Sequence, residues 1–93
     1  MPSYRTIMTV TTLAPGRAPE EVEAAARSVT RLESWDIAIA SGQPRVTARF
    51  TATDDAEARA IHREITAAVR FVADVPRARL AAVVRGRSHY LAP

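Results

Sequence analysis

Two histidines, His62 and His89, are the side chains of this sequence best suited to acid–base chemistry near neutral pH. His89 stands between Ser88 and Tyr90, so that a hydroxyl, a base and a phenol follow one another. Neighbours in sequence do not make a catalytic triad, because the reacting groups must converge in space. His62 falls beside the apolar stripe of a predicted helix, where a partly exposed surface histidine is the simpler interpretation.

The sequence contains no motif that is typical of a metal or cofactor site. There is no cysteine, so disulfides, thiolate metal sites and cysteine nucleophiles are excluded. No His-x-x-x-His or Glu-x-x-His spacing occurs, and neither a P-loop nor a Gly-x-Gly-x-x-Gly motif can be found among only 3 glycines. The sequence therefore predicts no metal site and no cofactor.

Arginine supplies the whole basic content, 13 residues without one lysine, and the net charge is +3 with a pI near 10.5. A basic chain invites a nucleic-acid hypothesis. However, a GC-rich coding sequence would favour arginine over lysine without any demand for guanidinium chemistry. Asp55 lies four residues before Arg59, and Asp74 lies four after Arg70, so we expect local ion pairs. Nucleic-acid binding is expected to be weak and non-specific.

Length and composition place the chain among ordinary globular domains. With 93 residues, 47% apolar and 25% charged, it has room for one core, and we expect a single domain over 1–93. The first ten residues lack the basic region and apolar run of a signal peptide. No stretch approaches the ~20 apolar residues that cross a bilayer. We expect a cytoplasmic protein without membrane contact.

Hydrophobic periodicity predicts two helices and four strands. The first strand covers about 4–13, and a helix from about 19 to 33 begins with Pro19 and two acids. Residues 35–41 and 45–51 alternate around a Gly-containing turn and predict an antiparallel hairpin. A second helix, 55–73, starts at Asp54 with Glu57 three residues later, as in a capping box. A last strand follows over 79–85, and 87–93 is interpreted as a tail.

The order of strand, helix, strand, strand, helix, strand resembles the ferredoxin-like βαββαβ superfold. It implies an α+β domain with a four-stranded antiparallel sheet, strand order 4-1-3-2, and both helices on one face. Alternation assigns residues such as Met8, Ile37, Ile39, Phe50 and Leu80 to the covered face.

The opposite, open face is predicted to have an apolar centre and an arginine rim, which is the composition of a protein interface. The residues expected in this interface are Ile7, Ala38, Ala40, Arg49, Ala81, Val83 and Arg85.

Three functions stay open, because a superfold does not carry function. The leading hypothesis is a non-catalytic accessory or protein-interaction domain that forms a homo-oligomer, a dimer or larger, through its open face. The second is a small dimeric α+β barrel enzyme, or a binder of a small organic ligand. The third is a non-specific nucleic-acid-binding domain. For the second hypothesis, the candidate catalytic residues are Arg49, His62, His89 and Tyr90.

Overall fold

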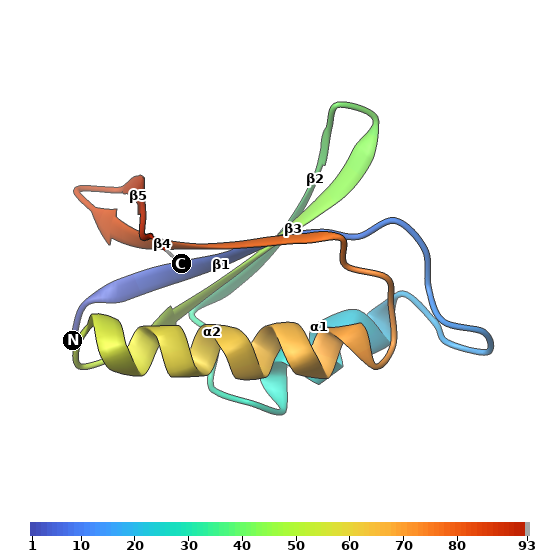
Figure 1. Cartoon of the computed structure of the whole chain (residues 1–93), viewed down its shortest axis with the longest axis horizontal. Helices are drawn as coiled ribbons and strands as arrows, with labels where there is room; N and C mark the ends of the chain where they lie inside the picture. The colour runs from blue at the N-terminus through green and yellow to red at the C-terminus, as the bar shows by residue number, and fades with distance from the viewer. Residues whose placement is uncertain (93) are drawn as a thin grey trace.

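The computed structural model describes residues 1–92, which form two helices packed on one face of an antiparallel sheet (Figure 1). The elements in chain order are β1 (Ser3–Thr9), α1 (Glu20–Arg27), β2 (Ser34–Ala40), β3 (Gln43–Thr51), α2 (Asp55–Arg70), β4 (Arg77–Val84) and β5 (Arg87–Tyr90). None of the helices is long and apolar enough to cross a membrane over the described residues.

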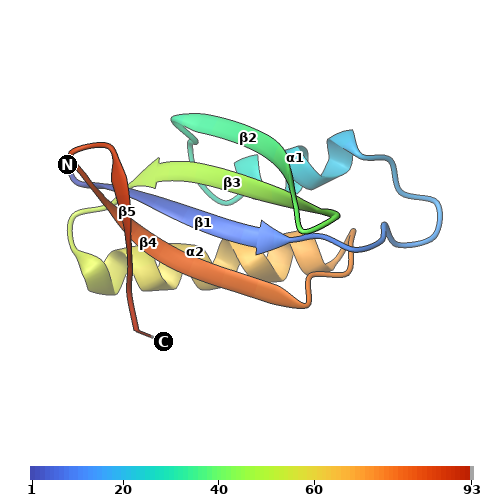
Figure 2. The same cartoon turned by 90° about the horizontal axis from the view of Figure 1, so that it is seen from above.

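The sheet has five strands in the order β2-β3-β1-β4-β5 (Figure 2), so the predicted four-stranded sheet is wrong. Segment 87–93, which we interpreted as a tail, contains β5, and β5 pairs antiparallel with the end of β4. The cause is a tight turn at Arg85 and Gly86, whose φ angles are 53° and 79°. Two consecutive positive φ angles close a two-residue hairpin loop, which reverses the chain onto β4.

The core lies between the helices and the alternate residues of the three middle strands. Tyr4, Thr6 and Met8 of β1 are buried, as is Phe50 of β3. Ile65 on α2 is also fully buried, and Ile61 packs against the same cluster. The Tyr4 hydroxyl donates to Oδ1 of Asp55 over 2.8 Å, and burial together with this contact raises the pKa of Tyr4 to about 12.

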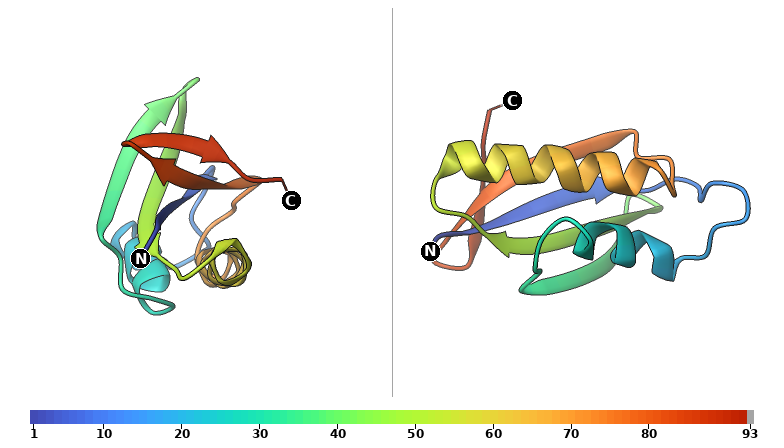
Figure 3. Two further views of the ribbon diagram at one scale, coloured as in Figure 1. Left: turned by 90° about the vertical axis from the view of Figure 1, so that its left-hand side faces the viewer. Right: turned by 90° about the horizontal axis from the view of Figure 1, so that it is seen from below.

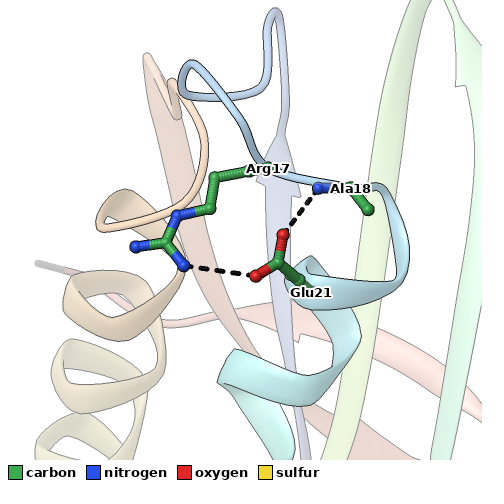
Figure 4. A network of polar contacts seen from close by, with 3 residues as sticks. All are labelled: Arg17, Ala18 and Glu21. Carbon is green, nitrogen blue, oxygen red and sulfur yellow. Dashed lines mark hydrogen bonds and ion pairs between the residues drawn. The ribbon is translucent and has the colours of Figure 1, made fainter.

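Both helices begin with side-chain contacts to free backbone groups. Asp54 accepts a hydrogen bond from the Glu57 amide at 2.8 Å, so the predicted cap of α2 is confirmed. In α1, Oε2 of Glu21 accepts from the Ala18 amide at 2.6 Å, while Arg17 donates to Oε1 at 3.2 Å (Figure 4). The backbone contact, followed by Arg17, lowers the pKa of Glu21.

Helix α1 ends at Arg27, well before the predicted end near residue 33. The Ser28 hydroxyl donates to the Ala25 carbonyl at 2.6 Å, and Val29 and Thr30 follow with β-branched side chains that disfavour a helix. Ile37 and Ile39 of β2, predicted to be core, are 65% and 71% exposed, because the β2–β3 hairpin rises away from the helices toward its tip (Figure 1).

The two hairpins of the sheet curve to the side away from the helices (Figure 3, left). The β2–β3 hairpin turns at Ser41 and Gly42, both with positive φ, as the β4–β5 hairpin does at Arg85 and Gly86. Both hairpins thus rise on the open side of the sheet, beside its middle strands.

Candidate functional site

Five arginines project from the open face of the three middle strands. Their positions follow from the register, because they alternate with the buried residues of each strand. Arg5 of β1 lies directly opposite Arg49 of β3, and Thr9 lies opposite both Arg45 and Arg77. The complete set is Arg5, Arg45, Arg49, Arg77 and Arg79. We call this set the arginine face.

A groove of about 280 Å³ runs along the arginine face. It is bounded by β1, β2, β3 and β5, and we call it the open-face groove. Two of its side chains are cationic, and hydroxyls from two different strands accompany them. Its lining residues are Arg5, Ile7, Asp36, Arg45, Thr47, Ser88 and Tyr90.

Strand β5 holds two of the arginines in place. Nη1 of Arg5 donates to Oγ of Ser88 at 2.8 Å, and Nη2 donates to the Gly86 carbonyl at 3.5 Å. The guanidinium carbon of Arg79 lies 3.7 Å from the ring centroid of Tyr90, which is cation–π geometry. These contacts reduce the side-chain entropy that a ligand would otherwise have to remove.

The Arg49 side chain is incompletely satisfied. Its Nε atom lies 3.5 Å from Oε1 of Glu33 and is buried without a hydrogen bond. The same Glu33 oxygen already accepts from the Ser3 hydroxyl at 2.6 Å. Arg49 also lies directly opposite Arg5, and like charges in that position disfavour strand pairing.

A second hollow lies between α2 and β4, on the helix side of the sheet. Two neighbouring cavities of about 640 and 340 Å³ share His62, Arg63 and Ala78. We call them together the His62 cleft. Nδ1 of His62 is 3.0 Å from Oγ1 of the buried Thr6, which fixes the orientation of the imidazole. Burial lowers the pKa of His62, and the charges of Arg63 and Arg70 add to the effect.

The helix arginines near this cleft do not form the ion pairs that we predicted. Arg59 donates to the Ala92 carbonyl at 3.3 Å, and Arg70 donates to the Val75 carbonyl at 3.0 Å. The predicted partners are engaged elsewhere, since Asp55 accepts from Tyr4 and Asp74 accepts from Thr11. Tertiary contacts have replaced the pairs expected from helical spacing.

The four catalytic candidates do not meet at one site. His62 lies in the cleft on the helix side, whereas Arg49 and Tyr90 belong to the open face. His89 is on β5, where it pairs with Ala82 of β4, and it is exposed. Across residues 1–92, no cluster of three or more histidines and acids is arranged to hold a metal ion.

The residues predicted for an interface do not form one continuous surface either. Ile7 lines the open-face groove, and Ala81 is completely buried between Arg5 and Tyr90 in the sheet. Val83 pairs with Ser88, and Arg85 lies in the hairpin turn. Ala38 and Ala40 are on the outermost strand, β2.

Sequence reasoning missed most of the open-face groove. Arg5, Arg45, Thr47 and Ser88 were not singled out as ligand-binding residues, because β5 was not predicted and the groove needs it as a wall. A signal was available in the dipeptide Arg85-Gly86, which has the same place after a strand as Ser41-Gly42.

No family model matches the chain, and the comparisons with curated proteins and with solved structures likewise found no match.

Proposed function

We propose that this chain is a non-catalytic binding domain that holds a small organic anion, a carboxylate or a phosphate ester, in the open-face groove. The main observation in support is the arginine face. Within residues 1–92, only Arg49 of its five members forms an ion pair. Arginine binds carboxylate and phosphate through two parallel hydrogen bonds, so Arg5 and Arg45, which both line the groove, can hold an anion there.

The dimensions of the groove favour a small ligand. About 280 Å³ lies just below the ~300–1,000 Å³ typical of small-molecule sites. Thr47 and Ser88 supply hydroxyls that can orient the anion, and Tyr90 lines the groove beside them. The site is thus equipped for recognition of a compact anion with a few polar substituents.

Assembly of two copies through the same face has less support. It would bring two sets of five arginines together, and like charges facing each other across an interface cost several kcal/mol. Ala81, expected at its centre, is already buried within the chain. Catalysis has less support too, since His62 lies on the other side of the sheet from the arginine face.

The proposal can be tested by titrating the isotope-labelled protein with citrate and with inorganic phosphate. Binding is followed by amide NMR shifts and by calorimetry. We expect shifts that concentrate on the strands around the groove. Arg5→Gln should weaken binding about tenfold or more, because a hydrogen bond to a charged group contributes ~1.5–3 kcal/mol. Arg31→Gln, which removes an equal charge from an exposed position outside the groove, is the control. A melting curve for each variant checks that it is folded.

Two results would contradict the proposal. Equal weakening by Arg5→Gln and Arg31→Gln would mean that only net charge matters. A ten-residue oligothymidylate that binds more tightly than both small anions, with a steep loss on adding salt, would support the nucleic-acid hypothesis instead.

A further inference from the structure

The outer edge of β2 is unpartnered over its whole length. Strand β2 has seven residues and pairs only with β3, so its other row of backbone N–H and C=O groups faces no strand within residues 1–92. Natural proteins protect such edges with lysine, proline, bulges or short strands. Strand β2 contains neither proline nor lysine, and its one charged residue is Asp36.

The apolar side chains of this edge are also uncovered. Ile37 and Ile39 project to the helix side of the sheet and are 65% and 71% exposed, since the hairpin rises beyond the reach of the helices (Figure 1). Trp35, on the same side of β2, is only partly buried. An edge that combines free backbone groups with a row of exposed apolar residues is a surface for strand pairing.

We propose that β2 pairs antiparallel with β2 of a second copy of this chain, across a two-fold axis at Ile37. This register uses all seven residues, with Ser34 of one copy opposite Ala40 of the other. It places Ile37 opposite itself and Ile39 opposite Trp35, so that the apolar side chains form one continuous row. A surface that is complementary to itself is what a closed dimer needs.

Charge complementarity on the opposite side supports the second copy as the occupant. In this register Asp36 lies opposite Ala38 of the other copy, and Ala38 neighbours Arg45 on β3. Asp36, Ala38 and Arg45 then form one row on the open side of the joined sheet, with the small alanine between the two charges. The two Asp36 carboxylates are then diagonal neighbours across the junction, and the Arg45 guanidiniums of both copies, one strand farther out on the same face, balance their charge.

Light scattering and cross-linking test the register. The wild-type chain of 10.1 kDa should have twice that molar mass at tens of micromolar. Ile37→Arg puts two like charges on the axis and should halve the mass without unfolding the chain, because the residue is exposed. Val84→Arg, which changes a 48% exposed valine on the other hairpin, should leave the dimer intact.

A cysteine placed on the axis provides a second, independent test. The chain has no cysteine of its own. Residues directly opposite each other in an antiparallel pair have Cβ atoms about 4.5–5.5 Å apart, close to disulfide geometry. Ile37→Cys should therefore give a covalent dimer under mild oxidation, at least tenfold faster than Ile39→Cys, whose opposite residue is Trp35. A monomeric wild type, equal cross-linking rates for the two variants, or a dimer that survives Ile37→Arg would each overturn the proposal.

Discussion

The two hairpins of the sheet differ in how much of their surface the rest of the chain contacts. At one edge the β4–β5 hairpin turns back over the open face, where it buries Ala81 and holds Arg5 through Ser88. At the other edge, the β2–β3 hairpin has the same kind of two-residue turn but leaves Ile37 and Ile39 exposed. The comparison shows that the β4–β5 hairpin makes contacts with the middle of the sheet, whereas the apolar side chains near the tip of the β2–β3 hairpin are not covered by residues 1–92.

The largest expected difference between the two hairpins concerns their apolar side chains. Leu80 of β4 is only 6% exposed, so Leu80→Ala should lower the free energy of unfolding by about 2–5 kcal/mol through lost contacts and a new cavity. Ile37→Ala removes a side chain that is already in water and should cost less than ~1 kcal/mol. Urea unfolding at a protein concentration low enough to give monomers measures both. Similar losses of stability in the two variants would remove the distinction between the two hairpins.

A pair of alanines on the open face makes the comparison sharper. Ala81→Gln must fit an amide into a site with no free surface, which should cost about 1–3 kcal/mol and loosen β5. Ala38→Gln makes the same change at an exposed position and should alter stability by less than ~0.5 kcal/mol. Thermal melts of both variants, with hydrogen exchange of the β5 amides, provide the measurement. Unchanged protection of β5 in Ala81→Gln would show that this strand does not depend on the packing around Ala81.

The smallest expected effect on stability is that of replacing His62, which lies next to β4. Its folded pKa lies below the unfolded value of about 6.5, so the unfolded chain takes up a proton more readily than the native one. Stability that is present above pH 6.5 is therefore lost as the pH falls below that value. His62→Gln should flatten this slope between pH 7 and 5, as read from denaturation midpoints. His89→Gln, at an exposed position of β5, removes a histidine away from the cleft, and an equal flattening there would contradict the assignment.

The sequence predicted the helices and the first four strands because each has its own periodic pattern. It did not predict where the helix layer ends. Alternation shows that Ile37 and Ile39 share a side of β2, but their burial depends on how far the β2–β3 hairpin rises away from the helices, which no local pattern encodes. Strand β5 is only four residues long and carries no period strong enough to detect, so its turn at Arg85-Gly86 was the one usable signal.

The open-face groove was less predictable than the fold. Tyr90 and Arg49 were singled out separately, but nothing in the sequence states that Arg5 lies opposite Arg49 or that Arg79 stacks on Tyr90. Such neighbours depend on strand register between segments far apart in the chain. A one-residue shift in β1 would exchange Arg5 with Thr6 and remove the groove.

The central place of β1 has a consequence for how this chain folds. Strand β1 pairs with β3 on one side and with β4 on the other, and its partner Leu80 lies near the opposite end of the sequence from Thr6. The β2–β3 and β4–β5 hairpins close over two residues each and need only local contacts, whereas the pairing of β1 closes long loops, and we expect it to be the slower step. Removing the first nine residues would take away the middle of the sheet and separate the molecule into two hairpins without a common strand.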